Sequence, residues 1–221
     1  MDDKERLKVL ENALAQMLKP VKGIPLNIII KSLSERTVIK FDRENPADQR
    51  VLEQLERAIR LCADEVKLKP IRRPRPNEVG NDIEQYVFRS LREVGLKPSA
   101  PTSAGGHGKS TGYPDILFHD AEGRPTYLEC KIFAQGTDPS TMRSFYLSPS
   151  ESFKVSLDAR HLLLAYGMQA EAVPNSRDSL YRPSSYKLVD LHDLLCDVKY
   201  EFNSDNRRLY NHGLMLLEGM V

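Results

Sequence analysis

The stretch of sequence that decides the fold is residues 112–133, which read GYPDILFHDAEGRPTYLECKIF. Asp115 stands at the start of a short apolar run, and residues 120–123 have the composition of a tight turn. A second extended run follows and carries Glu129 and Lys131, whose side chains share one face because alternate residues of a strand point the same way. If the two runs form a hairpin, Asp115 lies near Glu129 on that face. The stretch therefore predicts two carboxylates and a lysine that converge on one spot.

This set of side chains is typical of a divalent-metal site. Mg²⁺ prefers oxygen ligands, and proteins often bind it through one or two carboxylates while water and phosphate oxygens complete its coordination. Such an ion makes a bound water more acidic and stabilises charge on a phosphate. A lysine beside it orients or deprotonates the attacking water, or neutralises developing charge. The alternative is an ordinary hairpin with an exposed acid and an exposed Glu–Lys pair, which explains less well why all three side chains share one face.

The spacing of these residues resembles the signature of a known enzyme superfamily. Pro114-Asp115, thirteen further residues and then Glu129-Cys130-Lys131 are similar to the motif of the PD-(D/E)XK nucleases, which include restriction endonucleases, Holliday-junction resolvases and repair nucleases. The resemblance covers approximately residues 77–166 and leaves out the first 70 residues. In that superfamily a glutamate from the helix before the first motif strand often joins the metal site, and Glu84 occupies the matching place.

The resemblance implies a fold, a reaction and a set of site residues. The fold is α/β, a restriction-endonuclease-like core with a mixed central β-sheet flanked by helices, preceded by a helical N-terminal region. The reaction is Mg²⁺-dependent hydrolysis of DNA phosphodiester bonds that leaves 5′-phosphates, and Mn²⁺ is expected to substitute for Mg²⁺. The expected catalytic residues are Asp115, Glu129, Lys131 and Glu84, of which the three acids would bind the metal.

Three hypotheses for the function follow from this resemblance. The size of the chain favours a type II restriction enzyme that cuts double-stranded DNA at a specific sequence, and a twofold homodimer would suit a palindromic site. A structure-specific or repair nuclease of the same fold, which acts on junctions or flaps, is the second hypothesis. A module that keeps the fold and binds DNA without cutting it is the third. The cleavage pattern and metal binding distinguish them.

A basic, proline-rich stretch at residues 66–77 is expected to be a linker or an exposed loop. It separates a helical N-terminal region, residues 1–70, which would dimerise or embrace DNA, from a nuclease core, residues 77–221, within a single compact chain. Asn45 is expected to cap the second helix, with Pro46 in its first turn. Periodicity and turn residues predict helices at 3–19, 46–66 and 77–94, short helical pieces at 152–159 and 205–210, a loop at 97–113, and strands at 37–41, 115–118, 126–133, 144–147, 161–166, 186–191 and 198–202.

Loops and basic residues near the predicted site supply candidate DNA contacts. The segment Gly108-Lys109-Ser110 resembles the end of a nucleotide-binding loop, but Ser103 replaces the first glycine and no strand precedes it, so no nucleotide cofactor is expected. Lysine, arginine and serine side chains bind phosphates, and Arg and Gln also read base edges. Solvated loops and charged faces are the alternative. The candidate contacts are Lys109, Ser110, Arg143, Gln135, Arg73 and Arg75.

The overall composition excludes several classes of protein. The 221 residues carry 32 Lys and Arg against 31 Asp and Glu, so the chain resembles neither a basic coat protein nor an acidic tail protein. Its three cysteines are too few for a disulfide framework or a multi-cysteine zinc site, which fits a reducing compartment. No apolar run approaches the ~18 residues that a membrane span needs. We therefore expect a cytoplasmic protein without a membrane partner. The balanced charge does not exclude DNA, because acids at a metal site offset local basic clusters.

Overall fold

A computed structural model of the chain describes residues 3–19, 21–103, 112–134, 145–149, 153–199 and 207. Its helices are α1 (Asp3–Met17), α2 (Leu26–Ser34), α3 (Pro46–Leu68) and α4 (Pro76–Glu93). Its strands are β1 (Ile24–Pro25), β2 (Ile71–Arg73), β3 (Lys97–Ser99), β4 (Ile116–His119), β5 (Pro125–Ala134), β6 (Arg160–Ala172), β7 (Ser179–Asp190) and β8 (Leu195–Cys196).

The chain divides into two units. One unit runs from Pro25 to Leu195, and the other consists of residues 1–24 and 196–221. All the side chains of α1, in the second unit, are exposed. No helix in the part of the chain that the structure describes combines the length and hydropathy that a membrane crossing requires.

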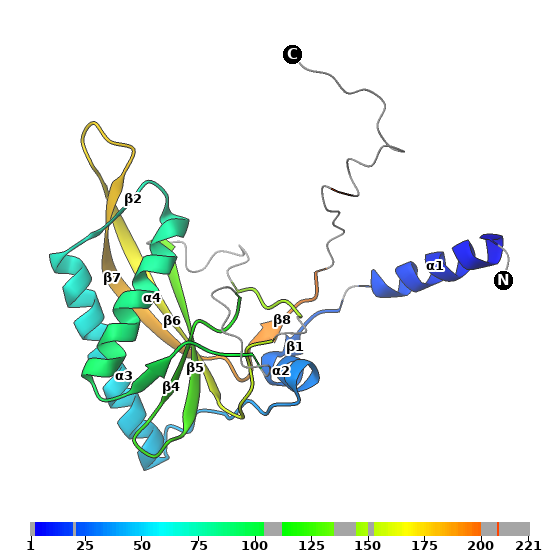
Figure 1. The fold of residues 1–221 in the computed structure, drawn as a ribbon, viewed down its shortest axis with the longest axis horizontal. Helices are drawn as coiled ribbons and strands as arrows, with labels where there is room; N and C mark the ends of the chain where they lie inside the picture. Colours follow the sequence, from blue (N-terminus) through cyan, green and yellow to red (C-terminus); the bar gives the residue numbers. More distant parts are fainter. Residues whose placement is uncertain are drawn as a thin grey trace. The chain divides into compact units, whose positions relative to one another are not determined.

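A six-stranded mixed sheet organises the larger unit, with the strand order β2-β7-β6-β5-β4-β3. β5 and β6 run parallel, and the other neighbouring pairs are antiparallel. The helices α3 and α4 lie side by side over one face of this sheet (Figure 1). This architecture confirms the predicted α/β class with a mixed central sheet flanked by helices.

The two long helices form where the sequence predicts them. Asn45 caps α3, because its side-chain oxygen accepts a hydrogen bond from the Ala47 N–H at 2.9 Å, and Pro46 occupies the first turn. Each helix buries one apolar stripe against the sheet, which presents alternate residues of β4, β5 and β6 to it. The core residues contributed by the two helices are Val51, Leu55, Ala58, Ile59, Cys62, Val66, Val79, Ile83, Val87 and Leu91.

Two segments expected to be irregular are strands. Residues 71–73, within the expected linker, pair with β7, and residues 97–99, within the expected loop, pair with β4. Both strands form edges of the sheet, where proline is tolerated because one side of the strand needs no partner. The prolines at 70, 74 and 98 therefore delimit or enter short edge strands without preventing them, and the prediction of irregular structure at these two places was wrong.

Several short elements also differ from expectation. Residues 26–34 form α2, which the sequence analysis did not predict, and in residues 37–41 the only strand-like contact is one bridge between Val38 and Ala159. The described parts of three other predicted elements, 145–147, 153–159 and 198–199, contain neither the predicted strands nor the predicted helix. The predicted helical piece at 205–210 lies outside the described residues except for Arg207. These segments are short, and tertiary contacts decide their conformation.

Candidate active site

The sheet gathers the three motif residues on the face that α3 and α4 do not cover. Leu128 pairs with Ile116 across the β4–β5 hairpin, and both side chains belong to the core beneath the helices, as does Cys130. Glu129 and Lys131 alternate with them and therefore point to the opposite face. Asp115 joins this group, because its Oδ2 accepts a hydrogen bond from the backbone N–H of Cys130 at 2.8 Å.

Glu129 is the most buried acid of the group. Its side chain is only 4% exposed, and its Oε1 forms an ion pair with the Nζ of Lys131 at 2.7 Å. Its other oxygen, Oε2, is buried without a hydrogen-bond partner among the described residues. A buried carboxylate oxygen without a partner is costly, so this atom is suited to receive a cation or a donor from outside the chain.

Glu84 shares the electrostatic environment of the motif residues. Burial raises the pKa of Glu84 to about 7, helped by the negative charge of Asp115 and opposed by Lys131 and Lys154. Burial likewise raises the pKa of Glu129 to about 7, and Asp115 adds to the rise while Lys131 opposes it. The structure thus brings Asp115, Glu129 and Lys131 together on the β4–β5 hairpin, and Glu84 of α4 lies within electrostatic range of them.

The donor set fits a hard divalent cation. In the ranges that the structure describes, no three His, Cys, Asp or Glu side chains are arranged to hold one ion among them. Mg²⁺ typically takes only one or two protein carboxylates. Asp115 and Glu129 supply two, and Glu129 has a buried oxygen without a partner. That Glu84 acts as a third ligand stays a prediction.

Sequence reasoning missed a second lysine of this cluster, Lys154. The predicted helical piece at 152–159 contains Lys154 without assigning it a role, yet its side chain is buried. Burial lowers the pKa of Lys154, and the charges of Asp115, Glu129 and Glu84 oppose that change. No periodicity or motif spacing marks this lysine, since only tertiary contacts bury it.

Buried aromatic and histidine side chains support the face on which the cluster lies. The hydroxyl of Tyr127 accepts hydrogen bonds from the backbone N–H groups of Ser156 and Leu157 at 3.0 and 3.3 Å. The Tyr113 hydroxyl is hydrogen-bonded to Nδ1 of His161, and burial lowers the pKa of that histidine to about 3. His161 is therefore neutral near pH 7 and serves packing, as its place at the start of an apolar strand suggests.

The structure describes two of the six predicted DNA contacts, Arg73 and Arg75. Arg73 forms a two-pronged ion pair with Asp82 of α4, at 2.6 and 2.7 Å, and Arg75 stands at the N-cap of α4 with an exposed side chain. The other predicted contacts, Lys109, Ser110, Gln135 and Arg143, lie outside the described residues.

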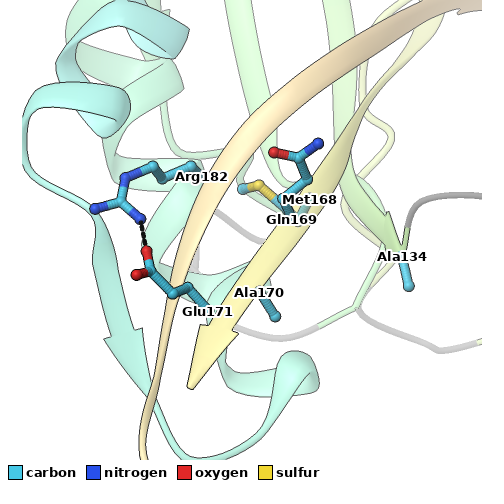
Figure 2. A pocket seen from close by; sticks show the side chains of 6 residues that line it. All are labelled: Ala134, Met168, Gln169, Ala170, Glu171 and Arg182. Atoms are coloured by element: carbon cyan, nitrogen blue, oxygen red, sulfur yellow. Dashed lines mark hydrogen bonds and ion pairs between the residues drawn. The ribbon is translucent and has the colours of Figure 1, made fainter. Parts of the chain in front are cut away.

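A shallow pocket of about 520 Å³ lies beside the end of β5 (Figure 2). Its lining comes from β5, β6 and β7, and an ion pair between Glu171 and Arg182 at 2.7 Å borders it. None of the predicted catalytic residues lines it. The lining residues are Ala134, Met168, Gln169, Ala170, Glu171 and Arg182.

Two comparisons with known proteins both point to type II restriction enzymes. The model of the type II restriction enzyme MjaV family matches residues 19–213. The type II restriction enzyme MjaV of Methanocaldococcus jannaschii is 35% identical over 233 aligned positions, which cover 99% of this chain and 98% of that protein. No solved structure matches the chain.

Proposed function

Because the chain belongs to the type II restriction enzyme MjaV family, we propose that it is a site-specific deoxyribonuclease that hydrolyses phosphodiester bonds of double-stranded DNA. The observation that carries the proposal is the cluster on one face of the β4–β5 hairpin. There Asp115 is bonded to the backbone of Cys130, and Glu129 is paired with Lys131. Negative charge develops on the phosphate during hydrolysis, and ammonium groups, together with a cation that the carboxylates would hold, stabilise that charge.

We assign the fold to the PD-(D/E)XK nuclease superfamily. The spacing of Asp115, Glu129 and Lys131 supports this assignment, as does the order of a glutamate-bearing helix followed by a hairpin with both motif acids. The restriction enzyme in the comparison favours sequence-specific cutting over a structure-specific nuclease or an inactive DNA-binding module.

Asp115 and Glu129 would hold a divalent cation, proposed to be Mg²⁺ with Mn²⁺ as a substitute. The bound ion supplies Lewis-acid stabilisation of the phosphate and increases the acidity of water. The chain uses no nucleotide cofactor in this proposal.

The side chains of the cluster have separate tasks. Burial lowers the pKa of Lys131, but Glu129, Asp115 and Glu84 outweigh that effect and raise it above its usual value. Lys131 is therefore an ammonium group that orients the attacking water and offsets phosphate charge. Glu84, with a pKa of about 7, is suited to accept a proton from that water near neutral pH. The water oxygen adds to phosphorus and the bond from phosphorus to the 3′ oxygen breaks. The 3′ oxygen takes up a proton from bulk water and becomes a hydroxyl, and a 5′-phosphate remains.

We also propose that the enzyme acts as a homodimer in the cytoplasm. A twofold dimer matches a palindromic DNA site. The helix α1 exposes apolar side chains spaced three and four residues apart, which suits pairing with a second copy. Within residues 1–70, α1 is thus the candidate for dimerisation, since α3 packs into the core of residues 77–221. These exposed side chains are Leu7, Leu10, Leu14 and Met17.

Digestion of long unmethylated duplex DNA tests the proposed function. The purified protein should yield discrete fragments with Mg²⁺ or Mn²⁺ and none with EDTA. The fragments should ligate without prior kinase treatment, because they carry 5′-phosphates. Cutting confined to branched DNA would favour the structure-specific nuclease instead, and no cutting of any DNA under these conditions would contradict both.

A further inference from the structure

A buried lysine without a carboxylate partner distinguishes this cluster. Lys154 is only 4% exposed. Within the described ranges, its side chain makes neither a hydrogen bond nor an ion pair. Lysine is almost never fully buried unless it is paired, because desolvating an ammonium group is costly. Lys131, by contrast, is one-third exposed and paired with Glu129 at 2.7 Å. Packing alone does not account for a lysine in this position.

The backbone that carries Lys154 is fixed against the active-site face. Ser156 and Leu157 donate their N–H groups to the Tyr127 hydroxyl, and that tyrosine is 1% exposed. Tyr127 precedes Glu129 by two positions on β5, so both side chains point to the same face of the sheet. Val155, adjacent to Lys154, is buried as well. The segment is therefore held over the face from which the catalytic carboxylate projects.

The charges around Lys154 are those of the proposed catalytic acids. Asp115, Glu129 and Glu84 all act on its ammonium group. These three carboxylates face two lysines, of which Lys131 already donates to Glu129. In the part of the chain that the structure describes, the Lys154 ammonium group donates to no side chain. Its N–H groups are therefore open to a ligand.

We propose that Lys154 is a second substrate-binding lysine of the active site, which donates hydrogen bonds to the non-bridging oxygens of the scissile phosphate. This proposal rests on the proposed nuclease function. A phosphodiester carries one negative charge, and nucleophilic attack adds charge to the same oxygens, so a fixed ammonium group binds the transition state more tightly than the ground state. In this role Lys154 donates hydrogen bonds only, and no covalent bond to it forms or breaks.

Single-turnover cleavage of duplex DNA tests this role with Lys154→Met, which keeps the length of the buried stem and removes the charge. The matched control is Lys97→Met, an exposed lysine on β3. At saturating Mg²⁺ we expect Lys154→Met to lower the cleavage rate by about 100-fold, the usual effect of removing one charge-stabilising donor. The control should cut like the wild type. Thermal unfolding identifies a variant that does not fold, and Lys154→Gln then serves as the second neutral substitution.

A purely structural role predicts a different result. If Lys154 only balanced the charge of the carboxylates, its neutral variants would change Mn²⁺ affinity in a titration yet cut at the wild-type rate once Mn²⁺ saturates. That outcome would overturn the proposal while leaving the nuclease function intact. Failure of the wild type to cut any duplex DNA would instead contradict the proposed function itself.

Tyr127 supplies a second test, because it positions Lys154 without touching the substrate. Tyr127→Phe removes the acceptor for the N–H groups of Ser156 and Leu157 and should lower the cleavage rate less than Lys154→Met does. In the double variant with Lys154→Met it should cause no further loss. Rate losses that simply multiply would show that Tyr127 does not act through Lys154.

Discussion

Replacing Glu129 with glutamine should stabilise the metal-free protein at neutral and alkaline pH. The carboxylate of Glu129 is buried near Asp115, and its pKa is raised from 4.5 to about 7. The folded state therefore binds an additional proton between pH 4.5 and 7, so stability falls as pH rises through this window. The glutamine variant lacks this loss, and its amide oxygen still accepts a hydrogen bond from Lys131.

The size of the effect follows from the pKa. A rise from 4.5 to about 7 corresponds to a loss of at most about 3.5 kcal/mol above pH 7, since one pKa unit is worth about 1.4 kcal/mol. The unfolding free energy of the variant should still fall with pH, but less than that of the wild type, because Glu84 also has a pKa of about 7. Glu129→Gln should therefore match the wild type near pH 5 and exceed it at pH 8.

Urea unfolding in EDTA at pH 5, 6, 7 and 8 measures this difference. The matched control is Glu171→Gln, because Glu171 forms an ion pair at the same distance of 2.7 Å but is 69% exposed. Its unfolding free energy should follow that of the wild type at every pH, since an exposed pair contributes little. The reasoning fails if the wild type is equally stable from pH 5 to 8, or if Glu129→Gln is the less stable protein at pH 8.

Three further predictions concern the metal, a buried charge network and a close contact. Mn²⁺ affinity in a calorimetric titration should rise with pH through about 7, because Glu129 must lose its proton to bind the ion; a flat profile would exclude it as a ligand. Asp48→Ala should lower the unfolding free energy in urea by about 3–5 kcal/mol. It removes the carboxylate that pairs with the buried guanidinium of Arg160 at 2.8 Å in the wild type. Gly167→Ala should lower the melting temperature measurably, because an added Cβ would lie 2.3 Å from Oγ of Ser185; an unchanged melting temperature would show that Ser185 moves aside freely.

The sequence predicts those elements whose signals are local. The long helices α3 and α4 combine an apolar stripe with proline in the first turn, and α3 has an asparagine cap as well. The β4–β5 hairpin has two apolar runs around a turn in which Gly123 adopts a positive φ. The spacing of its acids and Lys131 then implies a shared face, and the structure brings these side chains together.

The missed elements depend on contacts between distant residues. The strands β2 and β3 have three residues each and exist because β7 and β4 pair with them. In α2 the run Ile28-Ile29-Ile30 favours a strand locally, yet the segment is helical and buries Leu26 and Ile30. Lys154 is buried by tertiary contacts of its segment, among them the hydrogen bonds from the backbone of residues 156 and 157 to Tyr127. No local pattern contains this information.

The most direct test of the central claim is single-turnover cleavage of duplex DNA by Asp115→Asn, with DNA binding measured separately in Ca²⁺. Asparagine keeps an oxygen that accepts the Cys130 N–H but removes the charge that would bind the metal. The matched control is Asp82→Asn on α4, whose acid pairs with Arg73. We predict that wild type and control give the same discrete fragments, and that Asp115→Asn binds DNA but cuts at least about 100-fold more slowly, since each 1.4 kcal/mol of lost transition-state stabilisation is tenfold. Cleavage by Asp115→Asn at the wild-type rate would contradict the claim that this cluster is the catalytic centre.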